Sequence, residues 1–176
     1  KGKTFYIDAT CNHIPYTYTP QHIQGSEAMI EDGDKPLMQI VPQQKADSSI
    51  DSLSYAYHLQ GDALVGKANY LLRGDMKEWF MSLIDDAGNK NSEEILANNL
   101  NSDTHNMTVN NVKWIDKDAR NVWANFVGDI VNQPAIQQAD GEIYVELNPH
   151  NNLFDNRIDT TGRANDYYFP VRCNIV

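Results

Sequence analysis

The sequence predicts an α+β fold in which a mostly antiparallel β-sheet is interrupted in mid-chain by two to three amphipathic helices. Segments with apolar residues at every second position occur in neighbouring runs toward both ends of the chain. Segments with apolar residues three and four apart are grouped between them. This grouping is typical of an α+β arrangement rather than a doubly wound parallel sheet. At 176 residues the chain is expected to form a single domain, 1–176.

Three strands are predicted in the first half of the chain, after an N-terminal strand with Phe5, Ile7, Ala9 and Cys11 on one face. The run LMQIV is a short strand that stops at Pro42. The segment SLSYAYHLQ alternates strictly, and its aromatic content favours a strand. ALVGKANYLL follows after the turn-rich residues 60–62, so the two segments predict a hairpin.

Two further strands are predicted toward the C-terminus. EIYVELN places Ile143, Val145 and Leu147 on one face. The final segment places four residues on one face: Phe169, Val171, Cys173 and Ile175. The first and last strands are expected to lie close together.

The segment 75–88 predicts an amphipathic helix. Its apolar residues recur at helical spacing: Met76, Trp79, Phe80, Leu83 and Ile84. Asp75 is expected to cap the start and Gly88 to end the helix. Trp79, Phe80 and Leu83 are expected to be buried together.

A second helix is predicted within 116–134, because apolar residues keep helical spacing through three turns: Ala119, Val122, Trp123, Phe126, Val127, Ile130 and Val131. Asp116 or Asp118 can cap it, and Pro134 prevents its continuation. A competing strand interpretation accounts for fewer large residues: Val122, Ala124, Phe126, Gly128 and Ile130. A third, shorter helix is predicted in SEEILANNL, with Ser92 as its cap.

The charge of the chain argues against two classes of partner. The chain carries a formal net charge of -10, and its 14 basic residues form no cluster, so nucleic-acid binding and attraction to an anionic membrane are disfavoured. No run of eighteen apolar residues occurs, which argues against membrane insertion. The chain starts at Lys1, which fits a processed N-terminus or an excised segment equally well.

The two cysteines predict an intramolecular disulfide. Cys11 and Cys173 are the only cysteines, and both fall in the apolar phase of a predicted terminal strand. Such a bond would indicate an oxidising compartment, and therefore a secreted, periplasmic or surface location. The alternatives are two separate buried thiols in a cytosolic protein, or a reactive or intermolecular cysteine.

No catalytic residue is predicted, because no serine elbow, phosphate-binding glycine loop, CxxC pair or zinc-type histidine spacing occurs. No cofactor is predicted. Calcium is the one metal considered, since the polar loop 148–166 offers hard oxygen donors that include Asn148, Asp155 and Asp159. The absence of EF-hand spacing makes bound calcium the minority interpretation. Four residues are candidates for a sugar-binding or protein-binding surface: Tyr16, Tyr18, Asn151 and Asn152.

Two functional hypotheses follow. The first is a non-enzymatic extracytoplasmic domain that binds a protein or glycan, or that assembles as a structural subunit of a cell-surface filament or virion. The second is a small secreted hydrolase whose histidine and carboxylate groups meet only in the folded protein. A pocket that joins a histidine to a carboxylate with a shifted pKa would favour the hydrolase.

Overall fold

The computed structural model describes residues 4–88, 91–101, 107–133, 136–139 and 142–145. Its elements, in chain order, are η1 (Gln21–Ile23), β1 (Glu27–Asp32), β2 (Lys35–Ile40), η2 (Ala46–Ser48), β3 (Ile50–Gln60), β4 (Ala63–Arg73), α1 (Asp75–Ala87), α2 (Ser92–Leu100), β5 (Met107–Asp116), β6 (Trp123–Asn132), β7 (Ile136–Ala139) and β8 (Glu142–Val145), where η marks a short 3-10 helix, α an α-helix and β a strand. No helix in these ranges is long and apolar enough to cross a membrane.

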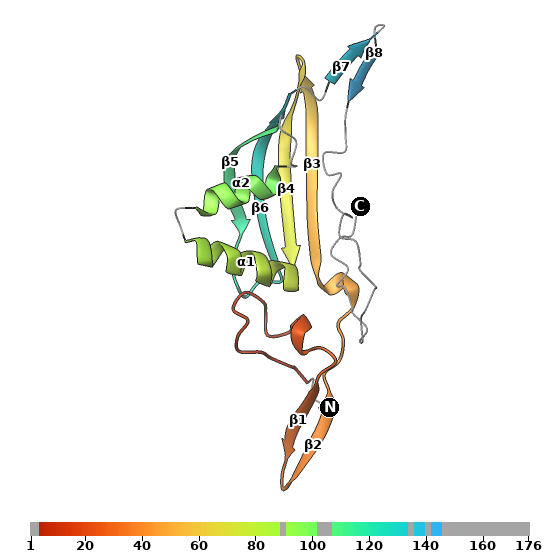
Figure 1. Cartoon of the computed structure of the whole chain (residues 1–176), viewed down its shortest axis with the longest axis vertical. Coiled ribbons are helices and arrows are strands. Elements are labelled where there is room, and N and C mark those ends of the chain that lie inside the picture. The colour runs from red at the N-terminus through yellow and green to blue at the C-terminus, as the bar shows by residue number, and fades with distance from the viewer. Residues whose placement is uncertain (1–3, 89–90, 102–106, 134–135, 140–141, 146–176) are drawn as a thin grey trace, which may run out of the picture.

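A four-stranded antiparallel sheet with the order β3-β4-β6-β5 forms the centre of the protein. The predicted hairpin is confirmed, since β3 and β4 pair along their whole length from Ile50↔Arg73 to Gln60↔Ala63. The hairpins β1–β2 and β7–β8 form two small separate sheets, which lie toward opposite ends of the long axis in Figure 1. The α+β class and the antiparallel pairing are therefore as predicted.

Helices α1 and α2 cover one face of this sheet (Figure 1). Phe80 of α1 stacks on Phe126 of β6 with ring centroids 5.3 Å apart, and both side chains are fully buried. Leu72, Leu100 and Ile130 complete the centre of this core. Full burial of such a side chain contributes about 1.5–3 kcal/mol relative to exposure.

The helix at 75–87 is confirmed, but its buried face differs from the predicted one. Lys77, Phe80 and Met81 are buried, whereas Trp79 is 59% exposed and Leu83 is 38% exposed. The expected burial of Trp79 with Phe80 and Leu83 is therefore wrong. The side chain of Lys77 is held by the loop that joins β5 to β6, which turns the buried stripe of α1 away from Trp79.

The prediction of a helix within 116–134 is also wrong, because most of this segment is strand β6. Its burial alternates, and Ala124, Phe126, Gly128 and Ile130 face the helices. On the opposite face, Trp123, Val127 and Val131 are apolar and half-buried. Apolar residues on both faces of a central strand reproduce helical spacing by coincidence.

The short helix at 92–100 is confirmed as α2, although Asn91 rather than Ser92 takes the N-cap position. It packs tightly on β6, where a Cβ added to Gly128 would lie 2.8 Å from Leu100 Cδ1. The described residues therefore contain two α-helices.

The predicted strand at 5–11 is not formed. The backbone N–H of Thr10 instead donates to the side chain of Asp8 at 2.8 Å, and that of Cys11 donates to the Asp8 carbonyl at 3.4 Å. These local bonds close a turn in place of an extended strand. Strand β8 confirms the beginning of the strand predicted at 142–148, whereas the predicted final strand lies outside the described residues.

Candidate functional site: an anchored hairpin arm

Strands β1 and β2 form a hairpin, residues 27–40, that we call the hairpin arm. Its register runs from Glu27↔Ile40 to Asp32↔Lys35, with Gly33 at φ 61° in the tight turn. Figure 1 shows that the arm projects away from the central sheet and its helices. In the described part of the chain, β1 and β2 pair only with each other.

The arm exposes large apolar side chains on both of its faces. The exposed fractions are 72% for Met29, 64% for Ile40, 57% for Met38 and 52% for Leu37. Met29 pairs with Met38 across the ribbon, whereas Leu37 pairs with Ile30 one position further along and therefore on the other face. A two-stranded hairpin is only marginally stable alone in water. Met29, Met38 and Ile40 share one face of the arm, and exposed apolar side chains that gather in this way are typical of interaction sites.

The arm is also acidic. Its sequence contains four acidic residues and one lysine, a formal charge of -3. Glu27 and Glu31 of β1 are exposed. Since strand side chains alternate between faces, these two carboxylates share a face with Met29.

The base of the arm is held by backbone and side-chain hydrogen bonds. The N–H of Gly25 donates to the Val41 carbonyl and the N–H of Val41 donates to the Ser26 carbonyl, both at 2.9 Å, and Val41 is buried. The Gln24 side chain donates to the Thr19 carbonyl at 2.8 Å and accepts from the N–H of residue 44 at 2.9 Å. These bonds fix the direction in which the arm leaves the protein.

The segment before the arm is tied to the first turn of α1. The buried hydroxyl of Tyr18 donates to Asp75 Oδ2, and the N–H of Gln21 donates to Asp75 Oδ1 at 2.9 Å. Burial and the neighbouring carboxylate raise the pKa of Tyr18, so its hydroxyl stays a donor. Asp75 was expected to cap α1, but it makes no capping bond there and holds the N-terminal segment instead.

A second tie lies one turn further along α1. The Glu78 carboxylate accepts the backbone N–H of Asn12 at 3.1 Å and that of His13 at 2.7 Å. The buried His13 also places Nε2 3.1 Å from Asp85 Oδ2. Three carboxylates of one helix therefore anchor the segment from which the arm extends.

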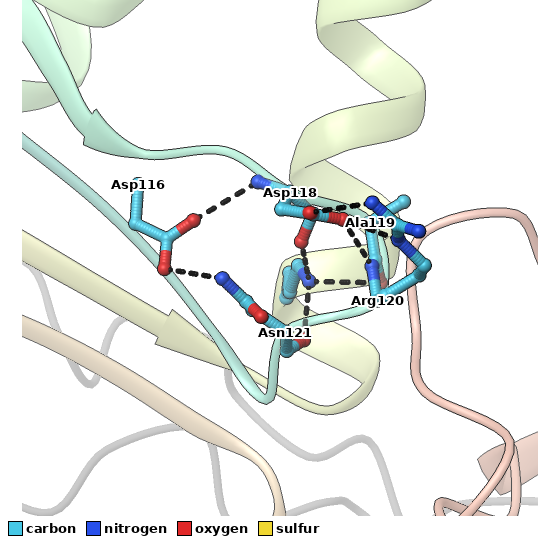
Figure 2. Close-up of polar contacts among 6 residues, drawn as sticks. Asp116, Asp118, Ala119, Arg120 and Asn121 are labelled. Carbon is cyan, nitrogen blue, oxygen red and sulfur yellow. Dashed lines mark hydrogen bonds and ion pairs between the residues drawn. The ribbon is translucent and has the colours of Figure 1, made fainter.

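Lys77 holds the other side of α1, and its side chain is completely buried. Its Nζ donates to the carbonyls of Asp118 at 2.9 Å, Ala119 at 3.2 Å and Asn121 at 2.7 Å. These carbonyls belong to the loop between β5 and β6 that Figure 2 shows. Burial lowers the pKa of Lys77, while Asp116 and Asp118 oppose that shift. All three ammonium protons are used, so the group is structural rather than nucleophilic.

The loop that receives Lys77 is itself closed by its own side chains. Asp116 accepts the N–H of Asp118 at 3.0 Å and the side-chain amide of Asn121 at 2.8 Å. The Arg120 side chain donates to Asp118 and thereby lowers the pKa of that carboxyl. Figure 2 shows these contacts around the turn.

One histidine lies against a carboxylate at the surface. His22 Nε2 is 2.6 Å from Asp8 Oδ2, while the backbone N–H and hydroxyl of Thr10 donate to Asp8 Oδ1 at 2.8 and 2.7 Å. The hydrogen bonds from Thr10 and then the one from His22 lower the pKa of Asp8 to about 2. Burial, followed by the charges of Glu78 and Asp8, raises the pKa that Cys11 has as a free thiol.

Of the remaining predicted site residues, one lies at the surface, one is buried, and the others lie outside the described residues. Tyr16 is 65% exposed and meets Phe5 edge-on at 5.2 Å, whereas Tyr18 is the buried donor to Asp75. Several predicted positions lie outside the described residues: Asn148, Asn151, Asn152, Asp155, Asp159 and Cys173. The calcium site and the disulfide from Cys11 to Cys173 therefore stay predictions. Within the described ranges, no three His, Cys, Asp or Glu residues form a group that could hold a metal ion.

A groove of about 580 Å³ lies between α1, α2 and β5. It brings Asp85 and Glu93 of the helices together with Lys113 and Lys117, over a floor that includes Trp114. No histidine lines this groove. It therefore does not provide the histidine and carboxylate pocket that would favour a hydrolase.

The fold and site define an α+β protein with a helix-covered antiparallel sheet and an anchored, apolar hairpin arm. Comparisons with protein-family models, with curated proteins and with solved structures found no match for this chain.

Proposed function

We propose that this chain is a non-enzymatic protein-binding or assembly module whose contact surface is the hairpin arm. The observation that carries the proposal is the exposure of Met29, Leu37, Met38 and Ile40 on an arm whose base is fixed by hydrogen bonds. A surface that is already ordered loses little conformational entropy when a partner binds.

The apolar area of the arm is large enough to matter for binding. Complete burial of each of the four side chains would contribute about 1.5–3 kcal/mol, and each is already partly covered. Together they supply roughly 4–7 kcal/mol before the entropic cost of association. This amount supports a specific contact when polar and backbone interactions add to it.

An extracytoplasmic location belongs to the same proposal, as a secreted, periplasmic or cell-surface protein. It rests on the predicted disulfide between Cys11 and Cys173, because disulfides persist in oxidising compartments. Mass spectrometry of the unreduced, unfolded chain is expected to find no alkylatable thiol. Two alkylatable thiols would remove the support for this location.

Site-specific photo-crosslinking in the native cellular context tests the role of the arm. A photo-reactive residue at Met29 or Leu37 is expected to form a defined adduct. The same residue at Trp79, an exposed apolar position on α1, serves as the matched control. Equal crosslinking from arm and control positions, or none from the arm, would contradict the proposal.

A second candidate function, a small hydrolase, is favoured by the pair His22 and Asp8. A carboxylate that is ionised at neutral pH and lies 2.6 Å from an imidazole can orient that ring as a general base. Ester and peptide hydrolysis that is lost in His22→Gln would establish this activity. Identical rates for the wild-type chain and His22→Gln would reject a role for this pair.

A further inference from the structure

We propose that the partner adds a β-strand to the outer edge of β1, and that this strand carries a basic, an apolar and a basic residue on one face. This inference rests on the proposed function, because it names the chemistry of the partner that covers the hairpin arm. It follows from three features of the arm: the direction in which the backbone groups of β1 point, the hydrogen-bonding groups on each edge, and the charges of the β1 side chains.

The hydrogen bonds at the base of the arm determine which backbone groups of β1 point away from β2. Val41 exchanges hydrogen bonds with Gly25 and Ser26, and a two-residue turn closes the ladder at Asp32↔Lys35. Hydrogen-bonded and non-hydrogen-bonded pairs alternate along an antiparallel ladder. The backbone N–H and C=O groups of Glu27, Met29 and Glu31 therefore point away from β2, and no described strand pairs with them.

The two edges of the arm are not equivalent. On β2 the corresponding outward positions are Pro36, Met38 and Ile40, and proline has no N–H to donate. Proline on an edge strand blocks the pairing of further strands. Strand β1 has no proline, so its edge presents the complete set of donors and acceptors. Strand addition at such an edge is a recurring mode of peptide recognition.

The side chains on this edge specify the complementary strand. Glu27, Met29 and Glu31 are all exposed and share one face. An added antiparallel strand places its own residues directly opposite them, where opposite charges and apolar pairs are favourable. Lysine or arginine opposite each glutamate, with an apolar residue opposite Met29, satisfies all three positions.

A second copy of this chain does not satisfy these positions. Antiparallel pairing of β1 with β1 of another copy, centred on Met29, would place Glu27 opposite Glu31 twice. Directly opposed like charges destabilise a strand pair. Each copy also carries a net charge of -10, so long-range repulsion acts against self-association.

The test uses a labelled peptide, Thr-Lys-Thr-Val-Thr-Lys-Thr, and fluorescence anisotropy with the full chain. Its Lys, Val and Lys residues share one face and direct their amides toward β1. N-methylation of those three residues is expected to abolish binding, whereas N-methylation of three Thr residues leaves binding intact. The variant carrying Glu27→Lys and Glu31→Lys is expected to bind the Lys peptide about fivefold or more weakly, and to prefer the Glu-containing counterpart.

Three results would overturn the inference. Equal binding of both N-methylated peptides would mean that backbone hydrogen bonds to β1 are not used and that charge attraction alone accounts for binding. Absence of binding by the unmodified peptide would exclude this partner chemistry. A doubled mass in solution that is lost on mutation of Glu27 would identify a second copy as the occupant. In each case a defined crosslink from the arm would still support the proposed function. Failure of the inference about strand addition can therefore be distinguished from failure of the proposed function.

Discussion

Replacement of Lys77 by methionine tests how α1 is held in place. Methionine keeps the apolar stem but removes the three hydrogen bonds to the carbonyls of residues 118, 119 and 121. A hydrogen bond from a charged donor contributes about 1.5–3 kcal/mol, but the variant also avoids burying an ammonium group. Asp118 and Asn121 are exposed, so their carbonyls can regain water. We therefore expect a net loss of about 2–4 kcal/mol in the free energy of unfolding.

Urea unfolding followed by tryptophan fluorescence measures this loss, with Lys67→Met as the matched control. Lys67 is 70% exposed and forms a surface ion pair with Asp129 at 3.2 Å. Loss of such a pair costs less than about 1 kcal/mol. A Lys77→Met variant that is as stable as Lys67→Met would refute the assignment of Lys77 as the clamp between α1 and the loop.

Three further predictions concern the core, the sheet and acid stability. Phe80 is fully buried, so Phe80→Ala should lower the free energy of unfolding by about 3–5 kcal/mol. Trp79 is exposed, so Trp79→Ala should lower it by less than about 1 kcal/mol. Similar urea midpoints for the two variants would contradict this. Gly66→Ala should disrupt β3–β4 pairing, since the added Cβ would lie 1.9 Å from the Ala56 carbonyl oxygen; unchanged amide protection in β3 would argue against it. Because folding lowers the pKa of Asp8 from 3.8 to about 2, its stabilisation is present above pH 4 and is lost as pH falls through 2. Asp8→Asn should therefore flatten the dependence of stability on pH between 4 and 2, and a slope equal to that of the wild type would count against this bond network.

The parts of the fold that were predictable are those with strong local patterns. The hairpin of β3 and β4 and the helix at 75–87 each combine one clear periodicity with turn residues at their ends, whereas the helix at 92–100 was indicated by Ser92, which begins the helix without capping it. Strand β6 was not predictable in this way. It lies in the middle of the sheet, and half-buried Trp123 and Val127 opposite buried Phe126 give it apolar residues on both faces.

The candidate site depends on contacts that no local pattern contains. Tyr18 and Asp75 are 57 residues apart, and His13 and Glu78 are 65 apart. The short run that stops at Pro42 indicated a strand at residues 37–41, but exposure of its side chains depends on which elements pack nearby. The one available signal for Lys77 was its position three residues before Phe80, on the same side of the helix.

Amide hydrogen exchange on the hairpin arm is the most direct test of the claim that this surface is covered by a partner. It should be measured on the purified chain and on the same chain in its native assembly. We predict fast exchange at Glu27, Met29 and Glu31 in the purified chain and strong protection of these amides in the assembly, with no change in the central strand β4. Equally fast exchange of the three arm amides in both samples would contradict the account.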